Sequence, residues 1–464
     1  MFGLENTVFL LLALCLFAAF AFEFVNGFHD TANAVATVIY TNSLKPQQAV
    51  VWSGFWNFLG VITGGVGVAM GIVKLLPMEL LIDQNIYHGV AMMMALLLTA
   101  ILWNLGTWYF GIPCSSSHTL IGSIIGVGLG YMFVSGNEKA VNWDKAKEIM
   151  TALGVSPIFG FALAIVLMFI LKKVIKLEGV FKEPKADQAP PMWIRAVLIF
   201  TCTLVSFFHG RNDGQKGIGL VMLILISITP VYFAIDTKQD PFSIRKDLVS
   251  LGATVNKIDT LSLSNAERES VHKAQASIKT LSAMVADSVK AIADDQKIMV
   301  RKEILSISKN TDKLLKSESL SLSSADKKTF KEEVASITKL IDYAPQWVIL
   351  MISLALGLGT MIGWKRIVVT IGEKIGKQHL TYAQGASAEI VAAITIGAAS
   401  TFGWPVSTTH VLSSGIAGTM VASKGIKNLQ AKTLKNIALA WVLTLPVTVI
   451  VSASLFVFFR WMVD

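Results

Sequence analysis

Charged residues are scarce in this chain of 464 residues. Asp, Glu, Lys and Arg together supply only 15% of the sequence, whereas hydrophobic residues supply 53% and the mean hydropathy is +0.60. These values lie outside the range of soluble globular proteins. We therefore expect a membrane protein that crosses the bilayer several times and resides in the cell (inner or plasma) membrane.

Cysteine is also rare, and the pattern of a cleavable leader is missing. Cys15, Cys114 and Cys202 lie in apolar segments without the spacing of a metal or redox site, so we interpret them as small buried residues. The only charge before the first apolar run is Glu5, and neither a basic n-region nor a small-residue cleavage pattern is present. We expect this run to be a retained membrane span.

Long apolar runs are abundant. About 20 apolar residues in a helix cross the hydrocarbon core, which is about 30 Å thick. The alternating pattern of a membrane barrel is absent, so the lipid-facing backbone is expected to satisfy its hydrogen bonds within helices. The sequence predicts an all-α polytopic fold with about 12 membrane segments. The apolar runs are 5–25, 31–40, 48–72, 86–110, 113–134, 152–171, 193–208, 214–235, 345–363, 379–402, 405–422 and 434–459.

Residues 236–344 form a charged insert in this apolar chain. There 34 of 109 residues are charged, against 37 of the other 355, so no membrane span is expected in it. Its 18 basic and 16 acidic residues give no polybasic face, and no nucleic-acid partner is expected. It contains no metal, nucleotide or catalytic pattern. We interpret it as a structural or assembly element.

The insert is internally duplicated. RKDLVSL at 245–251 is repeated as RKEILSI at 301–307, and a longer segment at 261–281 is repeated at 320–340. Each copy predicts two amphipathic helices joined by a Ser-rich turn. Two helical hairpins predict a soluble four-helix bundle.

A second duplication lies in the apolar part of the chain. GIPCSSSH at 111–118 and GWPVSTTH at 403–410 each contain a Gly, a Pro, three consecutive hydroxyl residues and a His. A Gly-x-Pro step ends one helix and starts the next, because Pro is tolerated in a first turn but breaks the helix before it. The hydroxyl groups are therefore expected at the start of a new helix.

The spacing of these motifs divides the chain into two halves. Each motif follows a segment that contains an aspartate: EFVNGFHDTANA includes Asp30, and SFFHGRNDGQKG includes Asp213. Asp30 and Ser116 are 86 residues apart, and Asp213 and Thr408 are 195 apart, which becomes 86 when the 109 residues of the insert are removed. The predicted domains are a first transmembrane repeat at 1–178, a linker at 179–192, the first part of a second repeat at 193–235, the insert at 236–344 and the remainder of the second repeat at 345–464.

The charges beside the two motifs indicate opposite orientations. Residues 74–85 and 135–148 carry 4 basic and 5 acidic side chains, whereas 364–378 and 423–435 carry 8 basic and 1 acidic. If each motif is the tip of a re-entrant helical hairpin, the positive-inside bias places the base of the second hairpin in the cytoplasm and that of the first outside. This predicts inverted-topology repeats with broken helices, whose tips approach near the midplane. The insert then falls outside.

The start of a helix is a favourable place for an anion. Unpaired backbone N–H groups and the positive end of the helix dipole lie there, and hydroxyl groups add further donors. Two such termini that face each other are predicted to bind one small tetrahedral oxyanion. The alternative is that the hydroxyl groups only cap their helices. His118 and His410 end the two motifs and are left out of the predicted ligands.

Asp30 and Asp213 are costly residues for a membrane segment. A carboxylate there costs about 2.5–3.5 kcal/mol even on the most lenient scale, so it is expected to face a cavity or a partner. Carboxylates, side-chain amides and carbonyls freed where a Gly interrupts the helix are the hard oxygen ligands that Na⁺ prefers. Neutralisation of Asp213 by Lys216 or Arg211 is the alternative.

Charge balance links the two predicted sites. A dianion with two carboxylates totals −4, which is unfavourable in a dehydrated pocket. Two or three co-bound cations relieve most of this charge. Because each ion then binds poorly without the other, the arrangement is a physical basis for symport.

With these motifs the chain resembles the inorganic phosphate transporter (PiT, solute-carrier-20) family. VNGFHDTANAVATV, FHGRNDGQKGIG, GIPCSSSHTLIG and GWPVSTTHVLSSG are similar to the paired signatures of the family, and the likeness covers all of the chain except 236–344. The resemblance implies a secondary transporter, and not an enzyme. It further implies uptake of inorganic phosphate, driven by Na⁺ or H⁺, by alternating access on an inverted-repeat fold.

The residue chemistry and the resemblance together give the expected site. The two aspartates, Asn212 and the hydroxyl triplets fall on family motifs, and Glu389 falls on an acidic position of eukaryotic members. No resident cofactor is expected; the partners are inorganic phosphate, Na⁺ and the lipid bilayer, and a homodimer is left open. The phosphate-binding set is Ser115, Ser116, Ser117, Ser407, Thr408, Thr409 and Gln215, and the sodium set is Asn26, Asp30, Asn33, Asn212, Asp213 and Glu389.

The chain departs from the animal members of this family at three positions. His29 and Lys216 stand where those members carry Asn, and Asn57 stands where they carry Glu. The Gln-Lys pair after Asp213 is similar to the prokaryotic branch, in which proton coupling and sulfate transport also occur. Sodium is the first expectation because of the oxygen ligands around Asp30. Proton-coupled symport of phosphate, metal-phosphate or sulfate is the alternative.

Two other classes fit the sequence less well. An intramembrane aspartyl protease carries a Tyr before one Asp and Gly-x-Gly-Asp at the other, whereas here the contexts are His-Asp and Arg-Asn-Asp. A channel needs a continuous pore and gains nothing from two motifs that meet at the midplane. Neither class accounts for the paired hydroxyl motifs.

Overall fold

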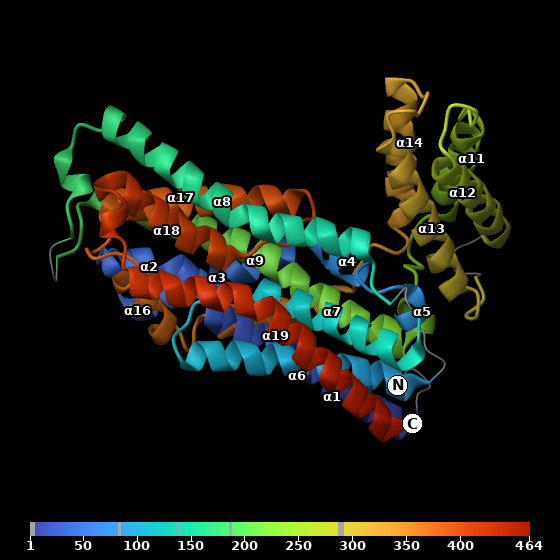
Figure 1. The fold of residues 1–464 in the computed structure, drawn as a ribbon, viewed down its shortest axis with the longest axis horizontal. Helices are drawn as coiled ribbons and strands as arrows, with labels where there is room; N and C mark the ends of the chain where they lie inside the picture. Colours follow the sequence, from blue (N-terminus) through green and yellow to red (C-terminus); the bar gives the residue numbers. More distant parts are fainter. Residues whose placement is uncertain (1–4, 82–84, 138–139, 185–187, 286–291) are drawn as a thin grey trace. The chain divides into compact units, whose positions relative to one another are not determined.

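The chain folds into helices in two compact units (Figure 1). The computed structural model describes residues 5–81, 85–137, 140–184, 188–285 and 292–464. Within these ranges the regular elements are helices, and the only β-pairing is an isolated bridge between Gly376 and Leu429. The all-helical prediction is confirmed. One unit comprises the residues up to Ile224 with Ala344–Asp464, and the other is Leu225–Tyr343.

The first unit contains the long apolar helices. Within the described residues, six segments have the length and hydropathy of a membrane span, and the bent pairs α3–α4 (73°) and α15–α16 (65°) raise the number to eight. The chain is a multi-pass membrane protein. The helices are α1 (Asn6–Asp30), α2 (Ala32–Tyr40), α3 (Pro46–Thr63), α4 (Gly67–Val73), α5 (Met78–Leu81), α6 (Ile86–Tyr109), α7 (Ser116–Ser135), α8 (Trp143–Val174), α9 (Met192–Ile228), α15 (Gln346–Thr360), α16 (Lys365–Glu373), α17 (Tyr382–Thr401), α18 (Thr408–Lys424) and α19 (Ala431–Val463), with short 3₁₀ turns at Glu178–Phe181 and Ile426–Asn428.

Glycines bring the central helices together without interrupting them. α1 runs through Gly27 and α9 runs through Gly210, so the prediction of carbonyls freed at these two glycines is wrong. A Cβ atom on Gly27 would lie 2.5 Å from the carbonyl oxygen of Leu356, and one on Gly210 would lie 2.2 Å from that of Asn57. Both glycines therefore allow close helix packing, of α1 on α15 and of α9 on α3.

Both hydroxyl motifs start a helix, as the Gly-x-Pro steps predict. α7 begins at Ser116 and α18 begins at Thr408. The turns before them contain Gly111 and Gly403, whose φ angles of 67° and 69° are left-handed and favour glycine. The two motifs thus have the same backbone form in the two halves.

The two halves of this unit exchange helices. We call α1–α8 the first half, and α9 with α15–α19 the second half. α7 of the first half packs on α19 of the second, and α18 of the second packs on α8 of the first (Figure 1). In the same way α6 contacts α19, and α17 contacts α8. Each hydroxyl helix is therefore held by the other half of the chain.

The second unit contains the charged insert. Its helices are α10 (Pro230–Phe233), α11 (Pro241–Asn256), α12 (Asn265–Met284), α13 (Lys297–Leu315) and α14 (Ser324–Thr338). α11 contacts α12 and α14, and α13 contacts α12 and α14, so the four long helices close into a bundle. Their apolar faces meet in a core that includes Leu248, Leu281, Ile304 and Phe330. Capping boxes of this kind stabilise helix starts, and Ser264 with Glu267 forms one at the start of α12.

Candidate functional site

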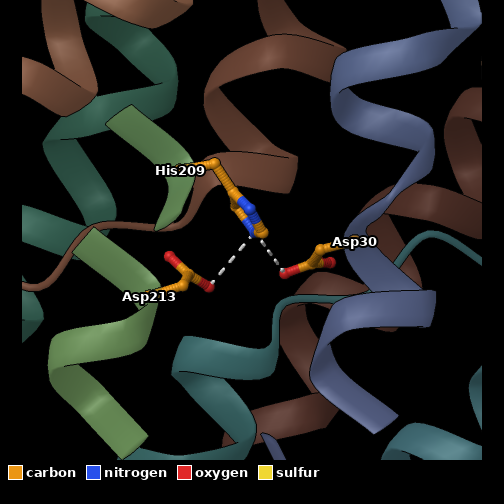
Figure 2. A group of neighbouring side chains, drawn as sticks. All are labelled: Asp30, His209 and Asp213. Carbon is orange, nitrogen blue, oxygen red and sulfur yellow. Dashed lines mark ion pairs between the residues drawn. The ribbon is translucent and has the colours of Figure 1, made fainter. Parts of the chain in front are cut away.

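Two carboxylates and an imidazole meet in the middle of the apolar unit. Asp30 ends α1, and His209 and Asp213 lie one turn apart on α9. His209 Nε2 is 3.8 Å from Asp30 Oδ2 and 3.7 Å from Asp213 Oδ2, and Figure 2 shows the ring directed between the two carboxylates. All three side chains are buried. Their ligand atoms are close enough together to hold one cation.

The hydrogen bond at Nδ1 of His209 determines whether Nε2 faces the two carboxylates with a lone pair or with a hydrogen. Its Nδ1 lies 2.8 Å from Asn57 Oδ1, while the amide nitrogen of Asn57 donates to Thr360 Oγ1 at 3.1 Å. Asn57 Oδ1 is an acceptor, so Nδ1 carries a hydrogen. A neutral ring then presents the lone pair of Nε2 to two carboxylates. Nε2 has no hydrogen-bond partner, so with the two carboxylates it is available as a ligand for a bound cation.

Hydroxyl groups from both motifs converge on the same carboxylate. Ser116, in the first turn of α7, donates to Asp30 Oδ2 at 2.9 Å and lies 3.4 Å from Asp213 Oδ2. Thr409, in the first turn of α18, donates to Asp30 Oδ1 at 2.8 Å. The two helix starts, from opposite halves, therefore meet at Asp30.

The other hydroxyl groups have separate roles. Ser115 and Ser407 cap α7 and α18 by accepting from backbone N–H groups, so the capping alternative holds for the first member of each triplet. Ser117 donates to the carbonyl oxygen of Val406 at 2.8 Å, which joins α7 to the segment before α18. Thr408 Oγ1 is buried and has no partner. Thr408 thus has a donor and an acceptor available for a ligand.

Two asparagines near Asp30 have unused oxygens. Asn33 donates through Nδ2 to Thr409 Oγ1 at 3.0 Å, and Asn26 donates to Glu23 Oε1 at 3.3 Å. The side-chain oxygens of both asparagines are buried without a hydrogen-bond partner. They are hard oxygen donors beside a carboxylate, as expected of ligands for a sodium ion.

Asp213 is paired with a lysine of its own helix. Lys216 Nζ donates to Asp213 Oδ1 at 2.6 Å, and both side chains are buried. The alternative of an internal salt bridge is therefore the arrangement found, with Lys216 and not Arg211 as the partner. The second aspartate is already neutralised on one of its oxygens.

Two residues predicted for the site are bound elsewhere. Gln215 accepts from the backbone N–H of Val68 and donates to the carbonyl of Gly64, so its amide holds the bend between α3 and α4. Asn212 donates to Ser400 Oγ and to the carbonyl oxygen of Trp404 at the end of α17. The structure does not bring either side chain to the cluster, because both are saturated by neighbouring elements.

Glu389 also lies apart from the cluster. Its Oε2 accepts a short hydrogen bond from Thr201 of α9, and its Oε1 is buried without a partner. It does not belong to the group of carboxylates and imidazole around Asp30. This separation could not be predicted from the sequence, since Glu389 precedes the second hydroxyl motif by only 14 residues.

Three further histidines border the site in different ways. His29 Nδ1 is 3.1 Å from Asp30 Oδ1, and its Nε2 is 3.2 Å from Thr107 Oγ1. His118 and His410 face each other with ring centroids 4.6 Å apart, and His410 stacks on Trp441. These two rings pack against each other, whereas His29 contacts the carboxylate of Asp30.

The chain matches the phosphate transporter family over residues 26–452, which include both aspartates and both hydroxyl motifs. The chain belongs to the phosphate transporter family. It is 42% identical to the low-affinity inorganic phosphate transporters PitB and PitA of Escherichia coli (strain K12), with 98% of this chain and 97% of each relative covered. It is 29% identical to a probable low-affinity inorganic phosphate transporter of Bacillus subtilis (strain 168), with 97% of each chain covered.

A solved structure shares the fold of this phosphate transporter family member. It is titled the sodium-dependent phosphate transporter and aligns with a TM-score of 0.55, covering 97% of this chain and 99% of its own. The sequence identity is 22%, so the likeness concerns the fold. The resemblance seen in the four motifs is thus confirmed at the level of the family.

Sequence reasoning missed two residues of this family member's central cluster. His209 lies four residues before Asp213, one helical turn away, so the spacing alone places it on the same face of α9. Glu23 lies seven residues before Asp30, is fully buried and packs against Gly217 of α9, the neighbour of Lys216. Seven residues are about two helical turns, so the spacing places Glu23 on the same face of α1 as Asp30. Neither residue belongs to the hydroxyl motifs on which the prediction depended.

Proposed function

We propose that this protein is a cation-coupled symporter of inorganic phosphate that works by alternating access, with Na⁺ as the first candidate for the coupling ion. One observation carries the proposal: Ser116 and Thr409, from two helix starts in opposite halves, donate to the same Asp30 carboxylate. A phosphate dianion is recognised by the same type of donor as a carboxylate, namely hydroxyl and backbone N–H groups at helix starts.

The hydroxyl groups supply a mechanism of coupling. Each hydroxyl has a single hydrogen to donate, so Ser116 and Thr409 cannot donate to Asp30 and to phosphate at once. When they turn to phosphate, the carboxylate loses its donors in a dehydrated site and needs a cation in their place. Phosphate and cation therefore favour each other's binding, which is the thermodynamic requirement for symport.

The oxygens around Asp30 favour sodium. Asn26 and Asn33, four residues before and three residues after Asp30, carry unpartnered amide oxygens, which together with the carboxylate are hard ligands of the kind that Na⁺ prefers. Thr408 adds an unpartnered hydroxyl for the phosphate. The relatives are named as low-affinity inorganic phosphate transporters, without a coupling ion, whereas the solved structure of the same fold is named as a sodium-dependent phosphate transporter.

A proton is the second candidate, and a specific contact favours it. His29 lies against one oxygen of Asp30 at 3.1 Å, and His209 lies near the other at 3.8 Å. A carboxylate between two imidazoles has acceptors and carriers for a proton on both sides. Proton-coupled transport of phosphate, metal-phosphate or sulfate by the same two hydroxyl motifs stays open on these contacts.

Alternating access requires two halves that rock against each other around a central site. The exchange of helices supports an inverted repeat, because α7 packs on α19 as α18 packs on α8. The bends also correspond: α3–α4 in the first half matches α15–α16 in the second. We propose that these halves are inverted in the membrane, with about 12 segments in all.

Uptake of labelled phosphate into proteoliposomes tests the function. We expect accumulation when Na⁺ is high outside, with sulfate as a competitor at equal concentration, and no accumulation in Asp30→Asn. Uptake that ignores Na⁺ but follows an imposed pH difference would replace sodium by the proton. Labelled sulfate that accumulates in preference to phosphate would overturn the choice of anion. Counterflow of labelled phosphate separates a carrier from a channel or a protease.

A further inference from the structure

Asn33 and Lys216 take the same position in the two halves. Each lies three residues after the aspartate of its half. Asn33 Nδ2 donates to Thr409 Oγ1 at 3.0 Å, and Lys216 Nζ donates to Ser117 Oγ. Each side chain therefore reaches the third hydroxyl residue of the other half's motif. The two positions match in their contacts and differ in charge.

Lys216 has the surroundings of a bound cation. An ammonium group has three hydrogens to donate. Those of Lys216 are matched by three oxygens: Asp213 Oδ1 at 2.6 Å, the carbonyl of Val406 at 3.1 Å, and Ser117 Oγ. The side chain is buried, with 2% of the residue exposed. A carboxylate, a carbonyl and a hydroxyl are also the oxygen types that hold Na⁺ in transporters.

The first half has no such ammonium. The ion-pair partners of Asp30 among the described residues are the histidines His29 and His209. Asn33 stands at the position of the lysine, and its side-chain oxygen is buried without a partner. A buried carboxylate beside an unused amide oxygen lacks the compensation that Lys216 gives to Asp213.

We propose that Lys216 is a tethered cation that permanently occupies the cation site of the second half, so that only the first half, at Asp30 and Asn33, takes a coupling ion from solution. This inference rests on the proposed cation-coupled transport. The ammonium is covalently attached to α9 and cannot dissociate into either compartment. The number of coupling ions per phosphate is therefore one lower than it would be with asparagine at both positions.

The test is Lys216→Asn, which copies the first half into the second. Proteoliposomes are held at zero voltage with an imposed cation gradient of about tenfold, for Na⁺ and then for H⁺. The measured quantity is the ratio of inner to outer phosphate at which net flux stops. Each additional coupled ion multiplies this ratio by about tenfold under such a gradient. We expect the ratio of Lys216→Asn to exceed that of the wild type by about this factor for one of the two ions.

The reciprocal variant makes the opposite prediction. Asn33→Lys puts an ammonium beside Asp30 and Thr409, so the same ratio is expected to fall by about tenfold relative to the wild type. The double variant, Asn33→Lys with Lys216→Asn, moves the site for the dissolved cation from the first half to the second. It is expected to restore the wild-type number of coupling ions per phosphate. Lys216→Arg retains the positive charge and serves as the matched control, with the ion number of the wild type.

The outcomes separate the inference from the proposed function. A wild-type protein that moves no phosphate would reject the proposed function itself. If the wild type couples normally and both Lys216→Asn and Asn33→Lys have the wild-type number of coupling ions per phosphate, only the tethered-cation proposal is overturned. Monodisperse elution in size-exclusion chromatography and phosphate counterflow identify the variants that fold. If Lys216→Asn fails these checks, the phosphate ratio at zero net flux of Asn33→Lys decides whether the proposal stands.

Discussion

The hydroxyl group of Thr409 donates a hydrogen bond to Oδ1 of Asp30 at 2.8 Å, although the two residues are 379 positions apart in the chain. Thr409 lies in the first turn of α18, which packs on a helix of the first half, and Asp30 ends α1. The exchange of helices between halves thus brings a helix start of one half to the carboxylate of the other. In the proposed mechanism, this bond couples the binding of phosphate to that of the cation.

Thr409→Val removes this hydroxyl while keeping the shape of the side chain. We expect phosphate uptake to fall by roughly tenfold to a hundredfold, because a hydrogen bond to a charged group contributes about 1.5–3 kcal/mol. Thr409→Ser should retain most of the activity. Thr419→Val is the matched control, since Thr419 is buried on the same helix but donates only to the carbonyl of Ile416. Equal uptake by the 409 and 419 valine variants would contradict the role of Thr409.

Glu389→Gln tests whether Glu389 binds a coupling ion, as the sequence predicts, or lies outside the cation site, as the structure indicates. Glu389 was predicted as a sodium ligand, but its hydrogen bond is to Thr201 and it lies outside the cluster around Asp30. We expect Glu389→Gln to keep the wild-type number of coupling ions, whereas Asp30→Asn loses gradient-driven accumulation. The measurement is the phosphate ratio at zero net flux. A lower ion number in Glu389→Gln would return this residue to the cation site.

Gly210→Ala tests the close approach of α9 to α3. The added Cβ atom would lie 2.2 Å from the carbonyl oxygen of Asn57, so the helices must separate at a cost of about 1–3 kcal/mol. The shift also disturbs the Asn57 contact that orients His209. We expect a lower melting temperature in detergent and weaker phosphate uptake.

Gly154→Ala is the control for the glycine variant. Gly154 lies inside α8, and a Cβ atom there meets nothing within 4 Å. Alanine in an open helical position is favoured over glycine by about 0.5–1 kcal/mol. We therefore expect an unchanged or higher melting temperature. A loss of stability equal to that of Gly210→Ala would show that helix packing is not the cause.

Arg301 tests how the insert is closed at its base. This residue is fully buried, and its Nη1 donates to the carbonyl oxygens of Ala234 and Ile341, on the segments that lead into and out of the bundle. Burial lowers the pKa of its guanidinium to about 10, although the nearby Asp342 opposes this shift. The group nevertheless remains charged at neutral pH, so its bonds to the two carbonyls are charge-assisted.

Arg301→Ala is expected to destabilise the bundle by about 3 kcal/mol, through two lost hydrogen bonds and a cavity. Cleavage within the insert by a protease, in the full-length protein, should then speed up on the order of a hundredfold. Arg245→Ala is the matched control, because Arg245 is the repeat counterpart of Arg301 and is exposed. Similar cleavage rates for the two variants would contradict the closure of the bundle by Arg301.

The local features of the site could be predicted from the sequence, because they depend on short-range rules. Gly111 and Gly403 each precede a Pro and a hydroxyl triplet, and a helix starts after both. The position of the charged insert follows from composition in the same way. The prediction of freed carbonyls at Gly27 failed, because a glycine inside a helix can mark close packing as well as a break.

The partners of each side chain could not be predicted, because they come from other helices. Asn212 and Gln215 are neighbours of Asp213 in the sequence, yet they bind the backbone of Trp404, just after α17, and of the α3–α4 bend. His209 joins the cluster because Asn57, 152 positions away, orients its ring. Helix spacing selects which residues share a face, but the neighbouring helices decide which of them meet a ligand.

By itself the sequence determined that this chain spans a membrane, that two motifs recur in it at matching spacing, and that its polar centres are hydroxyl-rich helix starts and aspartates. These properties follow from hydropathy, spacing and the backbone chemistry of Gly and Pro. Only the tertiary structure decided that Lys216 neutralises Asp213, that Asp30 keeps two hydroxyl donors from opposite halves, and that Glu389 stands apart. Buried charges must find partners in space, and the packing of helices from both halves selects those partners.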